Sequence, residues 1–122
     1  MISGKEIITS IPSRKDLLDI INNNDGILVL KFGAEWCGPC KKIEKQVLDW
    51  FDILPANVTC GLIDADENFD VMAFFKQKRK IKTIPAILRY DSDNKHWAPS
   101  DIICTSNENE INDFFKNIVQ DA

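Results

Sequence analysis

Cys37 and Cys40 carry the plainest chemistry in this chain of 122 residues, with Gly38 and Pro39 between them. Two thiols at this spacing can close a disulfide across one helical turn. The elements around them place Cys37 just before a helix and Cys40 in its first turn, where Pro39 is well tolerated because no N–H is needed there. The unpaired N–H groups of a helix start favour a thiolate. The pair therefore predicts thiol–disulfide chemistry with Cys37 as the reactive thiol.

Two other interpretations of the pair are open at this point. The cysteines could be inert buried thiols, although the helix start favours reactivity. They could also supply half of a zinc site, which needs a second cluster of ligands. The remaining candidate ligands, Cys60, His96 and Cys104, are widely separated in the chain. We therefore expect no metal site, and we expect no cofactor because the two sulfurs themselves carry the electrons.

The surrounding chain must position this pair, and its apolar runs and turn residues alternate between strands and helices. In chain order we expect a strand within 5–10, a helix after Ser13, a strand over 27–32, a helix from the dithiol to about 51, a strand over 58–64, a helix over 69–78, a strand over 86–90, a strand ending at 102–104 and a helix after Asn107. This order predicts an α/β fold with a central mixed β-sheet and helices on both faces.

Composition narrows the class of protein. Hydrophobic residues make up 44% and charged residues 28%, which is typical of a globular chain, and we expect a single domain over residues 1–122. The net charge of −4 argues against nucleic-acid binding. No apolar run approaches the roughly 20 residues of a membrane helix. The first six residues lack the apolar region of a signal peptide, so we expect a cytoplasmic protein. We also expect a monomer.

Two motifs resemble those of the thioredoxin family. The stretch Ala34-Glu35-Trp36-Cys37-Gly38-Pro39-Cys40-Lys41 is similar to the family's active-site motif, and Thr83-Ile84-Pro85 is similar to its second signature, a cis-proline that faces the dithiol. The resemblance extends over nearly the whole chain, because the expected order of strands and helices also agrees. It implies the thioredoxin fold.

The resemblance also implies an activity, protein-disulfide reduction by dithiol–disulfide exchange. Cys37 would attack a substrate disulfide and Cys40 would resolve the mixed disulfide. Trp36, Gly38 and Pro39 would form part of the substrate groove, together with Ile84 and Pro85 at the second signature. The backbone at Ile84 would pair with an extended substrate segment. The partners implied are disulfide-containing proteins and an electron donor such as a thioredoxin reductase or glutathione.

Two other activities stay open on the same fold. One is a redox-weak interaction module, because a fold does not guarantee a function. The other is an oxidase or isomerase. The Gly38-Pro39 pair resembles reductases and favours reduction.

Three positions depart from the family pattern. Lys31 stands where the family commonly has a buried Asp, and Leu62 stands where it commonly has a basic partner on the neighbouring strand. The acid–base pair behind the dithiol is therefore missing. Lys45 replaces a proline that often kinks the family's helix, so we expect a straighter helix after the dithiol.

Lys31 is the candidate for proton handling, and its side chain has two options. It can extend its ammonium to water, in which case it takes no part in the chemistry. It can instead stay near Cys40, where a cationic Lys31 favours the thiolate and a neutral one could accept the thiol proton. We favour the cationic form.

Two further features lie outside the motifs. Cys104 is expected at the position of a small groove residue in the family, where it could serve as an extra redox thiol, and a packed strand thiol is the alternative. Five cations occupy the segment 76–82, which we name the basic segment. It is either a solvated surface or a patch that attracts acidic partners to the groove.

Overall fold

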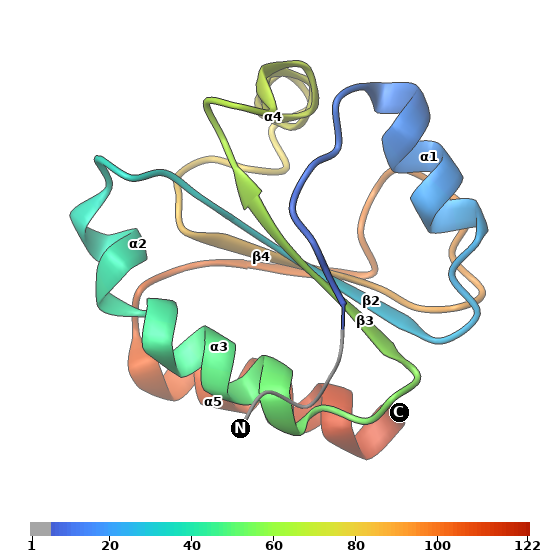
Figure 1. Cartoon of the computed structure of the whole chain (residues 1–122), viewed down its shortest axis with the longest axis vertical. Coiled ribbons are helices and arrows are strands. Elements are labelled where there is room, and N and C mark those ends of the chain that lie inside the picture. The colour runs from blue at the N-terminus through green and yellow to red at the C-terminus, as the bar shows by residue number, and fades with distance from the viewer. Residues whose placement is uncertain (1–5) are drawn as a thin grey trace.

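One mixed five-stranded sheet, in the order β1-β3-β2-β4-β5, organises the computed structural model, which describes residues 6–122 (Figure 1). The strands are β1 (Ile7–Ile8), β2 (Ile27–Gly33), β3 (Val58–Asp64), β4 (Ala86–Tyr90) and β5 (Asp101–Cys104). The helices are α1 (Arg14–Asn22), α2 (Gly38–Lys42), α3 (Glu44–Ile53), α4 (Phe69–Gln77) and α5 (Glu108–Asp121). Strand β3 runs parallel to β1 and β2, whereas β4 is antiparallel to β2 and β5. The predicted α/β architecture with a mixed sheet is confirmed.

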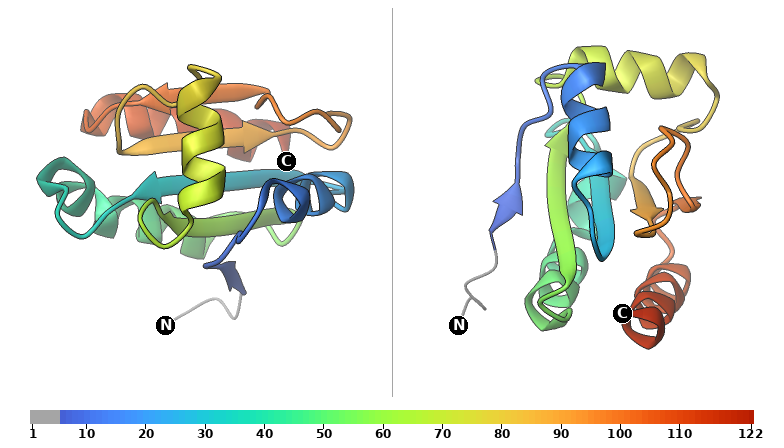
Figure 2. Two further views of the ribbon diagram at one scale, coloured as in Figure 1. Left: turned by 90° about the horizontal axis from the view of Figure 1, so that it is seen from above. Right: turned by 90° about the vertical axis from the view of Figure 1, so that its right-hand side faces the viewer.

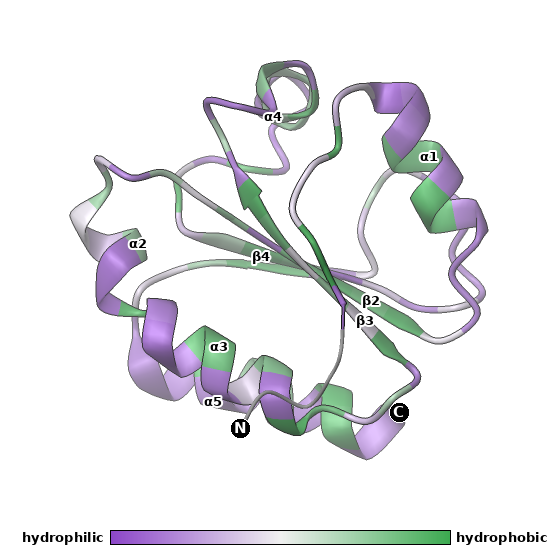
Figure 3. Ribbon diagram, viewed as in Figure 1, coloured by the Kyte–Doolittle hydropathy of each residue, from purple (hydrophilic) through white to green (hydrophobic). Residues whose placement is uncertain are grey.

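Helices cover both faces of this sheet, as predicted. Helices α1 and α4 lie on one face, and α3 and α5 lie on the other (Figure 2). Because successive side chains of a strand point to opposite faces, β2 contributes Leu28 and Leu30 to the first core cluster, and Ile27 and Val29 to the second. In Figure 3 the strands are largely hydrophobic, while the helices alternate between apolar and polar residues. Strand β2 is buried along its whole length and pairs with a strand on each side.

Side-chain caps start two helices where the sequence predicts. The Ser13 hydroxyl accepts a hydrogen bond from the Asp16 amide at 3.2 Å. At the start of α5, the Asn107 side chain accepts one from the Glu110 amide at 3.0 Å. Each cap satisfies an amide that has no partner inside its helix, and so it fixes the helix start.

The helix after the dithiol is interrupted, so the expectation of a straighter helix is wrong. Helix α2 ends at Lys42 and α3 begins at Glu44, with Ile43 between them at φ −100° and ψ 0°. Ile43 is buried in the core cluster beneath α3 and α5. The interruption thus occurs without proline or glycine, at a residue whose side chain is held by the core.

Candidate active site

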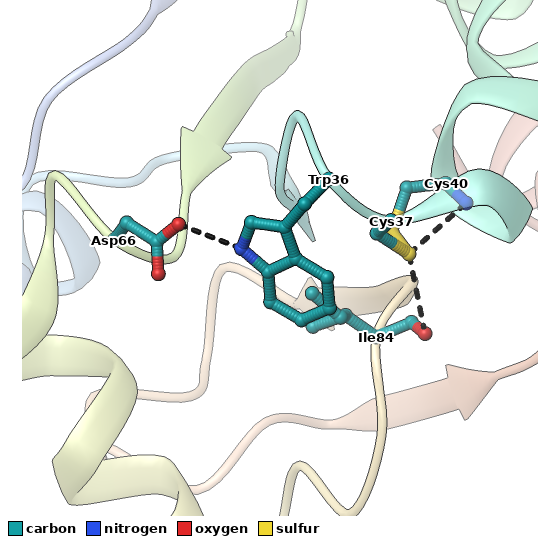
Figure 4. The surroundings of a disulfide bond; sticks show 5 residues. All are labelled: Trp36, Cys37, Cys40, Asp66 and Ile84. Carbon is teal, nitrogen blue, oxygen red and sulfur yellow. Dashed lines mark hydrogen bonds between the residues drawn. A yellow bond between two sulfur atoms is a disulfide. The ribbon is translucent and has the colours of Figure 1, made fainter.

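The dithiol lies where the sequence predicts, at the start of α2. Cys37 is the N-cap residue, Cys40 follows in the first turn, and the two form a disulfide with their Cα atoms 5.3 Å apart. The backbone amide of Cys40 donates a hydrogen bond to Cys37 Sγ at 3.2 Å (Figure 4). An amide at a helix start lacks a partner within the helix, so this one is available to stabilise a Cys37 thiolate when the disulfide opens.

Strand β2 and the short loop after it hold the dithiol in place. The Gly33 carbonyl at the end of β2 accepts a hydrogen bond from the Ala65 amide at 2.8 Å. The Ala34 carbonyl accepts one from the Cys37 amide at 3.2 Å, and the Cys37 carbonyl accepts one from the Lys41 amide at 3.2 Å. The loop is therefore tied to the centre of the sheet before it and to α2 after it.

The second signature faces the dithiol, as the resemblance implied. The Ile84–Pro85 peptide bond is cis, and Ile84 packs against the buried cluster of Ala34, Cys37 and Cys40. Cys37 Sγ lies 3.8 Å from the Ile84 carbonyl oxygen (Figure 4). In the disulfide, Cys37 Sγ carries no proton, so the two atoms are only in contact. In the reduced protein, the Cys37 thiol could donate a hydrogen bond to this carbonyl oxygen. The segment before β4 thus forms one wall beside the sulfur pair.

Trp36 is exposed beside the dithiol and is held by a residue that the sequence did not single out. Its side chain is 70% exposed, and its Nε1 donates a hydrogen bond to Asp66 Oδ2 at 2.8 Å (Figure 4). Asp66 lies in the turn after β3, where the Asp64 side chain accepts a hydrogen bond from the Asp66 amide at 2.9 Å. No local pattern connects Trp36 with Asp66, because only the fold brings these distant residues together.

Lys31 is buried behind the dithiol. It pairs with Leu62 of β3, so the structure places opposite each other the two positions where the sequence departs from the family pattern. Only 7% of Lys31 is exposed, and its Nζ approaches Cys40 across Gly33. Burial lowers the pKa of Lys31 below its ordinary value, and the nearby Glu44 carboxylate opposes this shift.

An open pocket of about 370 Å³ adjoins this lysine. Its charged and sulfur-bearing lining residues are Lys31, Glu35, Cys40, Lys41, Glu44 and Asp64. The pocket is therefore a polar space behind Cys40, and neither Ile84 nor Pro85 is among its lining residues. Sequence reasoning identified Lys31 and missed Glu44.

A family model described as Thioredoxin matches residues 10–117. The chain belongs to the thioredoxin family. Among its relatives, Thioredoxin-2 of Pyricularia oryzae is 28% identical over 93 residues, which cover 76% of this chain and 51% of that protein. Thioredoxin of Mycoplasma pneumoniae is 29% identical over 93 residues, covering 75% of this chain and 85% of that protein. The match to Thioredoxin 3 of Plasmodium falciparum covers 46% of that protein, so the chain spans about half the length of some of its thioredoxin relatives.

Solved thioredoxin structures share the fold. The structure of Trichomonas vaginalis thioredoxin matches with a TM-score of 0.73 and 21% identity, covering 91% of this chain and 96% of that one. Thioredoxin from Trypanosoma brucei brucei matches with a TM-score of 0.73 and 22% identity, covering 95% of this chain and 93% of that one. These likenesses confirm the thioredoxin fold predicted from the sequence.

Cys104 lies outside the thioredoxin dithiol. It is exposed at the end of β5 and pairs with Ala86, the residue after Pro85. A second pocket of about 360 Å³ adjoins it, lined partly by the carboxylates of Glu110 and Asp113. Both the position of Cys104 at the substrate groove and its redox role stay predictions.

The basic segment forms the end of α4 and the connection toward the second thioredoxin signature. Its five cationic side chains are exposed, namely Lys76, Lys78, Arg79, Lys80 and Lys82. Ile81 is buried and anchors the connection to the core. Within residues 6–122 none of these five cations forms an ion pair, and Lys78 Nζ instead lies 5.7 Å from the Trp97 ring centroid.

Residues 6–122 contain no group of three or more His, Cys, Asp or Glu side chains arranged to hold a metal ion. No helix in that range is both long and apolar enough to cross a bilayer.

Proposed function

We propose that this protein is a protein-disulfide oxidoreductase that acts mainly as a reductase, by dithiol–disulfide exchange through Cys37 and Cys40. The observation that carries this proposal is the Cys37–Cys40 disulfide at the start of α2, with Cys37 Sγ 3.8 Å from the carbonyl oxygen of Ile84. Membership of the thioredoxin family supports the same reaction.

The reaction proceeds by two sulfur exchanges. The Cys37 thiolate attacks one sulfur of the substrate disulfide, so that a Cys37–substrate bond forms and the substrate S–S bond breaks. The leaving sulfur takes the electron pair and then a proton from water. Cys40, once deprotonated, attacks Cys37 Sγ, which forms the Cys37–Cys40 bond and releases the second substrate sulfur. The substrate gains two electrons, and the dithiol loses two.

The substrate is held, in this proposal, in a groove beside Cys37 formed by Trp36, Gly38 and Pro39 on one side and by Ile84 and Pro85 on the other. A side chain built on Gly38 would meet no atom within 4 Å, so a substrate chain can approach closely there. An extended substrate segment would pair its backbone with that of Ile84. Because such pairing uses main-chain hydrogen bonds, it would accept substrates of many different sequences.

The proposed substrates are proteins that contain accessible disulfides. A thiol or dithiol donor must return two electrons to the oxidised pair after each cycle, and a thioredoxin reductase or glutathione would supply them. We place this reductase cycle in the cytoplasm, where thiols are kept reduced. We further propose that the protein works as a monomer, because the two sulfurs that react come from one chain.

A second candidate function is supported by Lys31. A buried cation behind Cys40 favours the reduced, thiolate form and makes the disulfide a better oxidant, which suits an oxidase or isomerase. A third candidate function is that of a redox-weak interaction module, because Lys31 replaces the family's buried acid.

Reduction of insulin, followed by turbidity with dithiothreitol as donor, tests the proposed activity. We expect the wild-type protein to accelerate precipitation of the insulin chains and Cys37→Ser to be inactive. A wild-type protein no faster than dithiothreitol alone would reject catalysis and favour the interaction module. A redox titration against glutathione then separates a reductase, with a low reduction potential, from an oxidase, with a high one.

A further inference from the structure

The resolving step depends on deprotonation of Cys40, and the buried carboxylate that the family commonly places behind this thiol is absent here. We propose that the ammonium group of Lys31 promotes the Cys40 thiolate electrostatically and thereby sets the reduction potential of the pair, given the exchange reaction proposed above. Lys31 is then a residue that acts on the reacting sulfur through its charge. Water in the pocket, in place of the missing acid, then accepts the proton of the Cys40 thiol.

Gly33 is the reason that the two groups approach each other. A methyl group built on Gly33 would lie 2.9 Å from Lys31 Nζ and 3.4 Å from Cys40 Sγ. The nitrogen–sulfur separation therefore cannot exceed the sum of these two distances. At such a range inside a protein, the attraction between an ammonium and a thiolate is strong enough to shift an ionisation.

The Lys31 ammonium also borders solvent, although the residue is 93% covered by the fold. Within residues 6–122, Lys31 forms no ion pair or side-chain hydrogen bond, and no side-chain nitrogen or oxygen there is both sealed from solvent and without a partner. Its nitrogen must therefore reach the pocket behind Cys40. The two options that the sequence left open, extension to water and proximity to Cys40, thus coincide in one conformation.

Other charges face this pocket from every element around it. They are Lys41 of α2, Glu44 of α3, Asp64 of β3 and Glu35 of the loop before Cys37. The three carboxylates disfavour a thiolate, but the three atoms nearest to a methyl group built on Gly33 are Lys31 Nζ, Cys40 Cβ and Cys40 Sγ, and no carboxylate oxygen is among them. Glu44 favours the charged form of Lys31 and so opposes the lowering of the lysine's pKa by burial.

The charge balance of the resolving step follows from this placement. The Cys40 thiol releases its proton to water in the pocket, and the resulting thiolate is paired with the Lys31 ammonium. The thiolate attacks Cys37 Sγ, the Cys37–Cys40 bond forms, and the substrate sulfur leaves with the electron pair and takes up a proton. Lys31 keeps its own proton throughout, and its attraction is lost when the thiolate is consumed. It therefore stabilises the reduced pair relative to the disulfide.

Redox titration of Lys31→Met against glutathione measures this effect. We expect the equilibrium constant for oxidation of the dithiol to rise about tenfold, which lowers the reduction potential by about 30 mV. Lys31→Arg retains the charge and should restore the wild-type value. Lys42→Met is the matched control, because it removes an exposed lysine of α2 that does not line the pocket, and its potential should stay unchanged.

Titration of Cys40 alone gives the second readout. In reduced Cys37→Ser protein the ultraviolet absorbance of the thiolate follows Cys40, after subtraction of a Cys37→Ser/Cys40→Ser reference. Adding Lys31→Met should move the midpoint of thiolate formation to higher pH. An unchanged potential together with an unchanged midpoint would overturn the role of Lys31, even if the wild-type protein reduces insulin. A Lys31→Met protein with unchanged potential but slow release of mixed disulfides would overturn it too, in favour of a neutral lysine base.

Discussion

Cys37 and Cys40 differ in what their surroundings offer to each sulfur. Cys37 Sγ accepts a hydrogen bond from the Cys40 amide at 3.2 Å and lies 3.8 Å from the Ile84 carbonyl oxygen, whereas Cys40 is 2% exposed and lies near Lys31 Nζ. The structure therefore supports a division of labour, in which Cys37 meets the substrate and Cys40 attacks from behind. Identical side chains would acquire different roles in the proposed reaction because one is the cap of α2 and the other lies inside it.

This division predicts the products of two substitutions. Cys40→Ser should accumulate mixed disulfides between Cys37 and substrate proteins, because nothing remains to resolve them, whereas Cys37→Ser should accumulate none. Non-reducing electrophoresis after incubation with oxidised insulin would show the adducts. In the reduced wild-type protein iodoacetamide should modify Cys37 before Cys40, and the reverse order would contradict the assignment.

Lys31 should cost stability while it serves the chemistry. Its folded-state pKa is lowered by burial, so the folded protein binds this proton less tightly than the unfolded chain. The penalty is complete below the folded pKa, and stability recovers as pH rises from there toward 10.5. Lys31→Met should remove the penalty and raise the free energy of unfolding at pH 7 by about 1 kcal/mol.

Urea unfolding of the oxidised protein at several pH values below 10 would measure this difference between wild type and Lys31→Met. The gap between the two should narrow as pH rises into the titration range of Lys31. Burial of Tyr90 raises the pKa of its hydroxyl, which lowers stability above pH 10 in both proteins and makes that range unsuitable. A Lys31→Met protein less stable than wild type at pH 7 would show that the lysine makes a net stabilising contribution.

Cys104 and Cys60 offer a comparison of exposed and buried thiols. Cys104 is exposed beside the second pocket, whereas Cys60 is fully covered in β3. Mild peroxide followed by mass spectrometry should oxidise Cys104 and leave Cys60 intact in the folded protein. If Cys104 also stays unmodified, the extra redox thiol proposed at this position is excluded.

The helices and strands show which parts of the architecture can be predicted. The bounds of β3 and β4 were predicted correctly, because each is a short apolar run beside a proline and turn residues. The interruption at Ile43 was not, since no proline or glycine signals it locally. The interruption also places Glu44 at the start of α3, so the pocket that Glu44 shares with Lys31 could not be predicted either.

The candidate site could also be predicted only in part. The dithiol and the cis-proline were predicted because each lies within a short motif whose neighbours set its geometry. The Trp36–Asp66 hydrogen bond was not predicted, because it depends on how separate elements pack. The approach of Lys31 to Cys40 was one of two options that the sequence left open, and the packing of the elements establishes it. Charge at Lys31 was evident in the sequence, but its distance from a sulfur was not.

The basic segment connects α4 to the segment before β4, beside the proposed groove, and should steer acidic substrates. Its five exposed cations lack ion-pair partners among residues 6–122, so their field extends into solvent. Because salt screens such fields over about 8 Å at physiological ionic strength, reduction of an acidic disulfide peptide should slow with added salt more than that of a neutral one.

A pair of charge-matched variants isolates the effect. Lys80→Gln should reduce the salt dependence with the acidic peptide. Lys116→Gln removes an exposed lysine of α5, on the opposite face of the sheet, and should leave the salt dependence unchanged. Equal behaviour of the two variants would leave the basic segment as a solvated surface.

Across the whole molecule, the sheet joins elements that differ greatly in how firmly they are held. Strand β2 is bonded to a neighbour on each side, and all of its residues are buried. Arg89 of β4 ties the sheet to α5 through Asp121, with Nη2 and Oδ2 2.8 Å apart. At one edge, β1 consists of Ile7–Ile8 and, among the strands of residues 6–122, pairs with β3 alone. The best-supported strand is therefore the one that leads directly into the dithiol loop.

The strand order has a consequence for hydrogen exchange. Amides of β2 should exchange with deuterium only when the whole sheet opens, whereas those of β1 should exchange through local fraying. Exchange followed by mass spectrometry on the oxidised protein should therefore give the slowest peptides from 27–33 and much faster ones from 6–10, and equal rates would contradict this gradient. If the gradient holds and β2 stays protected after reduction, the Cys37–Cys40 bond can break and form again over repeated turnovers without movement of the strand that leads into the dithiol loop.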